Sequence, residues 1–488
     1  MLVTRQLLLV ALLVALATAG CGARRTPDLA RIFAPARERT GKRPVIVIPG
    51  ILGSRLVNRN TGEVVWPSAI RSSVDGLSLP VSPELSANRD DLVPSRIVDT
   101  ARLIRLIPAD VYVYYELLGA LKDYGGYREG DWNAPGVDGD RDTFYVFPYD
   151  WRRDNVETAR ELVERIEALK VKLGRPDLRF NIVAHSMGGL VARYAAMYGG
   201  RELHGTGETP RPNWAGASHI NKIFMFGTPN AGSMEAFATL LEGYSITEGL
   251  RRRVRLLNKL SREDALTIPS IYQLLPHAGT AQFLDEHLQP IEGVDLYDPA
   301  TWKRYGWGAI HDARFRERFE RGEPQGEMTR GDRSSLAALD AYFAAALDRA
   351  RRFQEALDAE TNAPSGLPVQ LFAFGGDCEE TLVSPVVYRD EKRGRWVTLT
   401  APRSLRDAAG RELSRREVIR RMFEPGDGRV TRRSLLGETL PRPRTSALFQ
   451  TPLPVAYAVF ACDLHSEIQN NKTLQNNALT LLVGELAS

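Results

Sequence analysis

Short apolar runs alternate along this chain with longer stretches in which apolar residues recur every three or four positions. A run of four to seven mainly apolar residues is typical of a strand that is buried on both faces of a sheet. Such runs lie at residues 44–50, 144–149, 180–183, 220–226, 369–374 and 455–461. The clearest helix is predicted between Asp154 and Gly174, where a capping-box pair and a terminal glycine bound an apolar repeat. Strands that alternate with helices predict an α/β fold with a mostly parallel sheet and helices on both faces.

The alternation stops between residues 233 and 365, where the pattern becomes helical. An apolar stripe runs from Leu336 to Leu357 and predicts a helix packed into a core rather than a lipid-binding face. We therefore expect an inserted helical cap at 233–365. It would separate a first part of the core, residues 44–232, from a second part, residues 366–488.

The N-terminus has the features of an export signal rather than of a folded domain. Arg5 precedes an apolar core that is too short to span a bilayer, and small residues follow it. We predict a signal peptide at residues 1–20 and a tether at 21–43. Cys21 follows the small residues and resembles the lipidated cysteine of bacterial lipoproteins, although Thr18 stands where leucine is usual. We expect an exported protein, either anchored to a membrane through Cys21 or plainly periplasmic or secreted.

Composition narrows the class of protein further. The 488 residues are 43% hydrophobic and 25% charged, as in soluble globular proteins. A net charge of +4, with scattered basic residues, gives no reason to expect nucleic acid as a partner. Besides Cys21, only Cys378 and Cys462 are present. We hypothesise that these two form a disulfide in an oxidising compartment, and two unpaired buried thiols are the alternative.

The most informative motif is Ala-His-Ser-Met-Gly at residues 184–188, between a predicted strand and a predicted helix. Strand, tight turn through a serine and then helix is the nucleophile elbow of α/β-hydrolases. Small residues flank the serine because the turn is too sharp for larger side chains. Ala184 replaces the usual glycine, so a serine in an ordinary loop is the alternative interpretation of Ser186. His185 would point away from the nucleophile.

A serine nucleophile needs a histidine base and an acid that orients it. In this fold the chain order is serine, acid, histidine, each after a strand. His465 is the only one of seven histidines that follows a late strand, so it is the predicted base. Asp427 in a glycine-flanked turn and Asp377 after a strand are rival acids, and spacing does not separate them. Either aspartate also fits an ordinary turn.

The developing oxyanion needs two backbone N–H donors. The residue after the nucleophile, Met187, supplies one in this class of fold. The second comes from the loop after an earlier strand, and Ile51 in the Pro-Gly-Ile-Leu-Gly segment at 49–53 is the candidate.

Six motifs in order resemble the lecithin–cholesterol acyltransferases, whose relatives include lysosomal phospholipase A2 and phospholipid–diacylglycerol acyltransferases. They lie at residues 44–54, 148–152, 184–189, 227–233 and 426–435, with a final histidine. The resemblance implies that Asp427 is the acid, that Ile51 and Met187 supply the oxyanion donors, and that His465 is the base. The Asp-Trp-Arg segment at 150–152 looks structural in the family, and we interpret it here as an ion pair beside a core tryptophan.

Two departures limit what the resemblance implies. The family's vertebrate members carry a short disulfide-closed loop that helps to engage lipid, and no cysteine pair lies near Trp66. The cap, which would select substrates, matches poorly. We expect serine-dependent acyl transfer on lipid esters, by an O-acyltransferase or a phospholipase, without metal or cofactor. The alternatives are an esterase for a non-lipid substrate and a non-catalytic lipid-binding lipoprotein.

Overall fold

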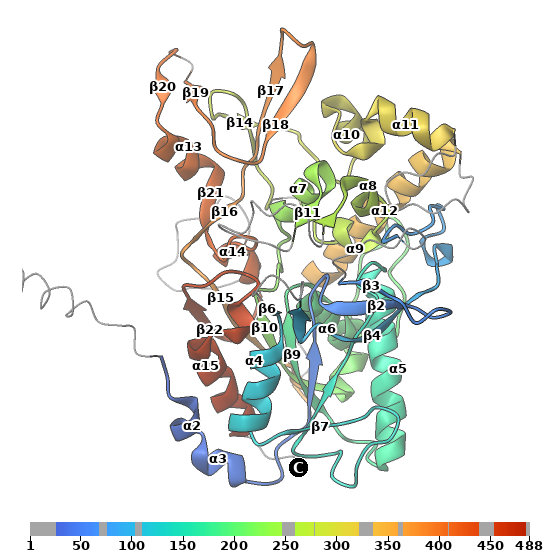
Figure 1. The fold of residues 1–488 in the computed structure, drawn as a ribbon, viewed down its shortest axis with the longest axis vertical. Coiled ribbons are helices and arrows are strands. Elements are labelled where there is room, and N and C mark those ends of the chain that lie inside the picture. Colours follow the sequence, from blue (N-terminus) through green and yellow to red (C-terminus); the bar gives the residue numbers. More distant parts are fainter. Residues whose placement is uncertain are drawn as a thin grey trace, which may run out of the picture.

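The computed structural model describes residues 26–67, 76–102, 110–245, 259–277, 279–321, 335–359, 365–407, 409–438 and 453–484 (Figure 1). The predicted signal peptide and Cys21 lie outside the described residues. Within those residues, no helix is both long enough and apolar enough to cross a bilayer.

A seven-stranded sheet forms the centre of the molecule, with the strand order β22-β15-β10-β9-β1-β8-β7. Every neighbouring pair is parallel. Its strands are β1 (Val45–Ile48), β7 (Arg128–Glu129), β8 (Thr143–Val146), β9 (Phe180–His185), β10 (Ile220–Phe226), β15 (Gln370–Gly376) and β22 (Val455–Ala461). The six strands predicted from apolar runs are all present, and the parallel α/β fold is confirmed.

Alternate residues of the central strands belong to different apolar clusters. Ile46 and Ile48 of β1 are buried in one cluster, whereas Val45 and Val47 are buried in the other. The first cluster includes helices α5 (Asn155–Leu173), α6 (Met187–Tyr198) and α12 (Leu336–Asp358); the second includes α4 (Tyr115–Gly119) and α15 (Lys472–Val483). Because side chains of a strand point to opposite faces in turn, a strand covered on both faces needs apolar residues at every position.

Helix α5 begins and ends where the sequence predicts. The Asp154 carboxylate accepts hydrogen bonds from the N–H groups of Val156 and Glu157, which caps the first turn. Gly174 ends the helix with a φ of 62°, a conformation that glycine adopts without a steric penalty.

The region predicted as a helical cap, 233–365, contains helices and also short strands. The apolar stripe of α12 is buried for most of its length, which confirms the predicted core packing. The helices before it are α7 (Met234–Glu242), α8 (Arg262–Leu266), α9 (Pro269–Tyr272), α10 (Pro299–Tyr305) and α11 (Ala313–Glu320). The short strands are β11 (Tyr244–Ser245), β12 (Lys259–Leu260), β13 (Phe283–Leu284) and β14 (Pro290–Ile291), which the apolar pattern does not reveal because two residues are too few to show a period.

A second insertion, between the sheet strands β15 and β22, pairs with this region. Strand β13 pairs with β17 (Val386–Asp390), which pairs in turn with β18 (Arg395–Leu399). This second insertion begins with β16 (Glu379–Leu382) and ends with β21 (Phe423–Gly426), and these two strands pair antiparallel. It also carries β19 (Leu405–Arg406), β20 (Glu412–Leu413) and α13 (Arg415–Met422), at the upper end of the molecule in Figure 1. Many exposed residues of this insertion are arginines. Basic residues therefore cluster here, in contrast to the scattered distribution expected from the sequence.

Beyond residue 28, the segment predicted to be a tether is partly helical. Two short helices, α2 (Leu29–Ile32) and α3 (Ala34–Glu38), lie there. Leu29 and Phe33 are buried in the second apolar cluster, against the face of the sheet that α4 and α15 cover. Two apolar side chains four residues apart therefore dock this segment onto the core, which a search for longer periodic runs overlooks.

The Asp-Trp-Arg segment is structural, as interpreted from the sequence. The buried Arg152 guanidinium donates hydrogen bonds to both carboxylate oxygens of Asp150 and of Asp90. Trp151 lies edge-on to Trp66 at 5.6 Å between ring centroids. These contacts join the β8–α5 loop to a small antiparallel sheet of β2 (Ser54–Asn58), β3 (Val64–Trp66) and β4 (Leu92–Ile97). The remaining pair, β5 (Thr100–Arg102) and β6 (Asp110–Tyr112), precedes α4.

Candidate active site

Ser186 occupies a strained turn between β9 and α6. Its φ and ψ are 51° and −126°, in a region that non-glycine residues rarely adopt. The neighbours of this turn must be small. A Cβ added to Gly50 would lie 2.8 Å from the Cβ of Ser186, and one added to Gly188 would lie 2.5 Å from the carbonyl oxygen of Pro49. The small residues of the motif therefore let the serine approach the loop after β1.

Ser186, His465 and Asp427 form a continuous hydrogen-bonded series. The Ser186 hydroxyl lies 3.0 Å from Nε2 of His465, and Nδ1 of His465 lies 2.8 Å from Oδ2 of Asp427. His465 is 7% exposed and Asp427 is 1% exposed, so water has little access to the series. The three residues come from loops after β9, β22 and β21, and they are separated by 38 to 279 positions in the sequence.

Of the two rival acids, Asp427 contacts the histidine and Asp377 does not. Oδ1 of Asp427 accepts hydrogen bonds from the N–H groups of Arg429 and Val430, which leaves Oδ2 for the imidazole. Asp377 is exposed to solvent just after β15. The turn at 426–430 thus holds its carboxylate in one orientation through its own backbone donors.

Gly227, in the motif at 227–233, makes room for the side chains of Asp427 and His465. Its φ is 59°, and a Cβ there would lie 3.0 Å from Nδ1 of His465 and 3.1 Å from Oδ2 of Asp427. Both the backbone conformation and the close approach therefore favour glycine at this position.

The two predicted oxyanion donors lie beside the nucleophile. Met187 is the first residue of α6, so its N–H points out of the helix N-terminus. Ile51 lies in the turn after β1, next to Leu52, whose φ is 64°. Among the described residues, neither N–H has a hydrogen-bond partner. Both donors are therefore available to a substrate oxygen.

A cavity of about 110 Å³ opens at the serine. Its wall is mostly apolar, and its aliphatic residues from the loop after β1 and from the inserted region include Leu52, Ala236, Leu260, Ile271 and Leu274. Arg429 is the cationic residue of the wall; its guanidinium lies 4.3 Å from the Tyr244 ring centroid and 3.1 Å from a carboxylate oxygen of Glu235. The wall therefore offers mainly apolar contacts to a group that enters at Ser186.

Sequence reasoning did not find the contacts of His185 and Tyr114. His185 points away from the Ser186 hydroxyl, as expected, but its ring is buried and hydrogen-bonded at both nitrogens. Its partner, Tyr114, lies 71 positions earlier, in a segment without a motif. No spacing signal connects two such residues.

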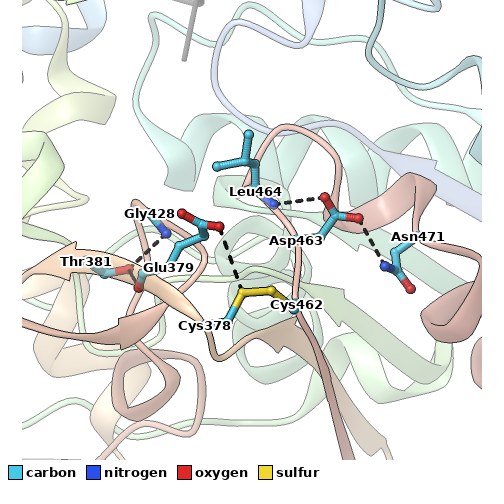
Figure 2. Close-up of a disulfide and its surroundings, with 8 residues drawn as sticks. All are labelled: Cys378, Glu379, Thr381, Gly428, Cys462, Asp463, Leu464 and Asn471. Atoms are coloured by element: carbon cyan, nitrogen blue, oxygen red, sulfur yellow. Dashed lines mark hydrogen bonds between the residues drawn. A yellow bond between two sulfur atoms is a disulfide. The ribbon is translucent and has the colours of Figure 1, made fainter. Parts of the chain in front are cut away.

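The structure joins Cys378 and Cys462 in a disulfide, with Cα atoms 5.2 Å apart (Figure 2). Cys378 follows β15 and Cys462 follows the adjacent parallel strand β22, so the bond links two strand ends near the His465 loop. Beside it, Thr381 of β16 accepts a hydrogen bond from the N–H of Gly428 at 2.9 Å. In the described residues, the one cluster with metal-ligand types is this pair with Glu379, and the disulfide occupies both sulfurs.

The parallel sheet, the elbow and the series from serine to aspartate define a protein of the α/β-hydrolase class. Residues 135–310 match the family model described as lecithin:cholesterol acyltransferase. This match confirms the resemblance indicated by the motifs. It includes the segment at 148–152, the elbow and the segment at 227–233, whereas Ile51, Asp427 and His465 lie beyond it. The match supports an acyl-ester hydrolase or acyltransferase in general.

Comparison with solved structures finds similar chains at low sequence identity. A chain in the crystal structure of the Tle4-Tli4 complex has a TM-score of 0.50 and 15% identity, over 91% of this chain and 98% of that one. The mature lipase BlEst2 of Bacillus licheniformis has a TM-score of 0.33 and 12% identity, over 91% and 92%. EstA from Clostridium botulinum has a TM-score of 0.33 and 12% identity, over 92% and 89%. No curated protein sequence matches the chain.

Proposed function

We propose that the protein transfers acyl groups from lipid esters through a covalent intermediate on Ser186. The observation that carries this proposal is the buried series in which the serine hydroxyl contacts His465 and His465 contacts Asp427. A serine hydroxyl becomes a useful nucleophile when a neighbouring imidazole takes its proton. The apolar cavity at the serine and the family match at 135–310 support an acyl chain as the group transferred.

The chemistry follows from these positions. The Ser186 oxygen attacks the ester carbonyl while Nε2 of His465 takes the hydroxyl proton. Asp427 holds the imidazole through Nδ1 and stabilises its positive charge. The N–H groups of Ile51 and Met187 would bind the oxyanion. Collapse of the tetrahedral intermediate expels the alcohol part of the lipid, which receives the proton from His465, and leaves an acyl-enzyme.

A second attack completes the cycle. Water or an acceptor alcohol gives a proton to His465 and attacks the acyl carbonyl, and Ser186 leaves with that proton. Water as acceptor makes the enzyme a lipase or phospholipase, and an alcohol makes it an O-acyltransferase. Both outcomes use the same residues, so the acceptor is decided by what enters the cavity.

Product analysis tests the proposal. The full-length protein is incubated with mixed phospholipids, with and without an added long-chain alcohol, and products are identified by mass spectrometry. We expect free fatty acid without the alcohol and a new ester with it, neither of which Ser186→Ala forms. Release from soluble short-chain esters alone would instead indicate an esterase for a non-lipid substrate. Failure of a fluorophosphonate to label the wild type at Ser186 would indicate a non-catalytic lipid-binding protein.

We further propose that the protein is exported and anchored by a lipid on Cys21. The support is the sequence pattern of residues 1–21. Metabolic labelling with an alkyne fatty acid should mark the wild type and not Cys21→Ser. Equal labelling of both proteins would contradict the anchor.

A further inference from the structure

The Tyr114 hydroxyl lies between the loop after β1 and the residue before the nucleophile. It is 2.8 Å from the backbone nitrogen of Gly50 and 2.8 Å from Nδ1 of His185. The Tyr114 side chain is 1% exposed. Because a backbone N–H can only donate, the hydroxyl accepts from Gly50, and its own proton remains for a bond to His185.

The carbonyl oxygen of His465 fixes the tautomer of His185, because a carbonyl oxygen can only accept a hydrogen bond. Nε2 lies 3.1 Å from this oxygen, so Nε2 carries the proton and donates, and Nδ1 of the neutral ring accepts the proton of Tyr114. Burial lowers the pKa of His185 well below its ordinary value, and the neighbouring His465 and Arg429 lower it further. The ring is therefore neutral, as this tautomer requires.

We propose that Tyr114 and His185 form a positioning pair for acyl transfer. The pair ties together the Gly50–Ile51 turn that carries an oxyanion donor, the strand end that carries Ser186, and the main chain of His465. No proton passes along it, because each hydrogen is already bonded to an acceptor that stays in place. The inference rests on the proposed function at Ser186. It assigns a role to Tyr114, which lies outside the family match, and to His185, which lies inside it.

Close packing supports a positioning role rather than a replaceable contact. A Cβ on Gly53 would lie 2.8 Å from the Tyr114 hydroxyl, and a Cβ on Gly50 would lie 3.2 Å from Nδ1 of His185. The two rings meet edge-on, with centroids 5.6 Å apart. These glycines leave the hydroxyl in direct contact with its partners. Loss of the hydroxyl would leave buried donors and acceptors without partners and let the turn move.

The test compares Tyr114→Phe with Tyr145→Phe. Tyr145 is a matched control because its buried hydroxyl donates to the carbonyl oxygen of Gly139 at 2.8 Å, away from Ser186. For a soluble ester we expect Tyr114→Phe to lower kcat about 10- to 100-fold, with KM changed less than about twofold, because the loss lies in the oxyanion and base geometry. Affinity for a boronic acid that mimics the tetrahedral intermediate should fall in parallel. Tyr145→Phe should leave both unchanged.

A second series keeps the inference testable if Tyr114→Phe folds poorly. His185→Gln retains an amide donor toward the His465 carbonyl, whereas His185→Leu retains none, so the glutamine variant should keep at least about tenfold more kcat. Equal kcat in both His185 variants, or unchanged boronic acid affinity in Tyr114→Phe, would overturn the positioning role. Failure of the proposed function looks different, because then the wild type itself would not react with a fluorophosphonate.

One segment of the chain is strongly basic. Residues 386–421, here called the arginine lobe, contain eleven Arg or Lys and five Asp or Glu, a net charge of +6, whereas the whole chain carries +4. All eleven cationic side chains are exposed. Of these, Arg389, Arg393 and Arg411 are ion-paired. Among the described residues the other eight have no carboxylate within 4.0 Å.

Helix α13 concentrates this charge on one surface. Val418 and Met422 are buried on its inner side, and Arg415, Arg416, Arg420 and Arg421 are exposed. Figure 1 shows α13 with β17 and β18 at one end of the molecule, beyond the carboxyl edge of the sheet where Ser186 lies. Strand β21 follows α13 directly and leads to Asp427. The lobe therefore lies on the same side of the sheet as the catalytic cavity.

We infer that the arginine lobe docks on an anionic phospholipid surface. A bilayer with anionic headgroups attracts clustered cationic side chains near its plane. A bilayer fits better than a nucleic acid because the lobe accompanies an apolar cavity for an acyl chain, a link that rests on the proposed function. Contact with the headgroups would hold the cavity close to its substrate.

The test measures the affinity of the full-length protein for phosphatidylcholine vesicles with and without phosphatidylglycerol. A lipid anchor inserts into both kinds of vesicle, so the ratio of the two affinities removes its contribution. The lobe variant replaces Arg415, Arg416, Arg420 and Arg421 with Gln. The control replaces Arg31, Arg37, Arg201 and Arg211, which are also exposed and, within the described part of the chain, without an ion pair. We expect the preference for anionic vesicles to fall at least about tenfold in the lobe variant only.

Activity on a soluble ester should be the same in both variants, which separates docking from chemistry. An equal loss of preference in the two variants would overturn the inference, because net charge alone would then explain binding. Loss of binding to a soluble polyanion such as RNA, with vesicle binding retained, would also overturn it and would indicate a different partner. Inactivity of the wild type would instead count against the proposed function.

Discussion

The main-chain N–H of His465 donates a hydrogen bond to the carbonyl oxygen of Asp427 at 2.8 Å, in parallel with the bond between their side chains. His465 and Asp427, the proposed base and acid, are thus connected twice, once through backbone and once through side chains. A backbone link fixes the relative position of the two loops, so the imidazole needs little reorganisation during proton transfer.

The choice of acid is tested by paired substitutions. Asp427→Asn should lower kcat about ten-thousandfold, because an amide in place of the carboxylate favours the wrong imidazole tautomer. Asp377→Asn should change kcat less than about twofold, since Asp377 is exposed and outside the series. Steady-state rates on a soluble ester check both, with Ser186→Ala, expected to lose about a millionfold, as the baseline. The reverse ordering of the two aspartates would reassign the acid.

Gly227→Ala tests the packing of the acid and base. Its Cβ would press on Nδ1 of His465 and on Oδ2 of Asp427 at a positive φ, so we expect kcat to fall about 10- to 100-fold. Gly62→Ala is the control, because Gly62 has a φ of 73° and nothing within 4 Å of an added Cβ. The control shares the backbone strain without the contact. Equal kcat in both variants would mean that the pair tolerates the added methyl group.

Removal of the disulfide should destabilise the chain. Cys378 and Cys462 are 84 positions apart, and cross-linking so long a loop restricts the unfolded chain. We expect Cys378→Ala combined with Cys462→Ala to lower the free energy of unfolding by about 2–4 kcal/mol, measured by chemical denaturation. Wild type in reductant should match the variant. Alkylation of both thiols in unreduced, exported protein would contradict the bond.

Arg152 should contribute more to stability than its neighbour. Its buried guanidinium bonds to Asp150 and Asp90, so Arg152→Met leaves two carboxylates with a lost partner and should cost about 3–5 kcal/mol in denaturation experiments. Arg153→Gln removes one ion pair, between the residue before the N-cap of α5 and Glu157 in its first turn, and should cost less than about 1 kcal/mol. Similar losses in the two variants would argue against a special role for the buried fork.

The elements that sequence predicts best here are those fixed by local physics. The apolar runs identify the six long strands because burial on both faces demands apolar side chains at each position. The elbow at Ser186 follows from steric limits that only small neighbours satisfy. The family resemblance identifies the motif at 227–233, but the steric need for glycine at 227 arises from contacts with His465 and Asp427 that form only on folding.

What sequence does not reveal depends on contacts between distant segments. Asp427 and Asp377 are both aspartates in turns, and only folding brings the first to His465. Tyr114 lacks a motif and meets His185 through tertiary packing. The two-residue strands of the inserted region show no period, and the arginines of α13 gain meaning as a surface only when Val418 and Met422 are seen to face inward.

The neutral state of His185 predicts an acid-dependent loss of stability. Burial holds its folded-state pKa well below the ordinary value of 6.5, so the unfolded chain binds a proton near and below pH 6.5 that the folded chain does not. Stability contributed by this group is therefore present above pH 6.5 and is lost as the pH falls below that value. The slope for one proton is about 1.4 kcal/mol per pH unit.

His185→Gln isolates this contribution because glutamine does not titrate. The free energies of unfolding of wild type and variant, measured by denaturant titration between pH 7.5 and about pH 5, should differ most at pH 7.5 and converge as the pH falls. His465, Asp427 and Arg429, the ionisable groups nearest the site, are unchanged in the variant, so the difference reports on the substitution at 185. A constant difference across this range would mean that His185 gains its proton as easily folded as unfolded. That result would contradict the tautomer on which the Tyr114 contact depends.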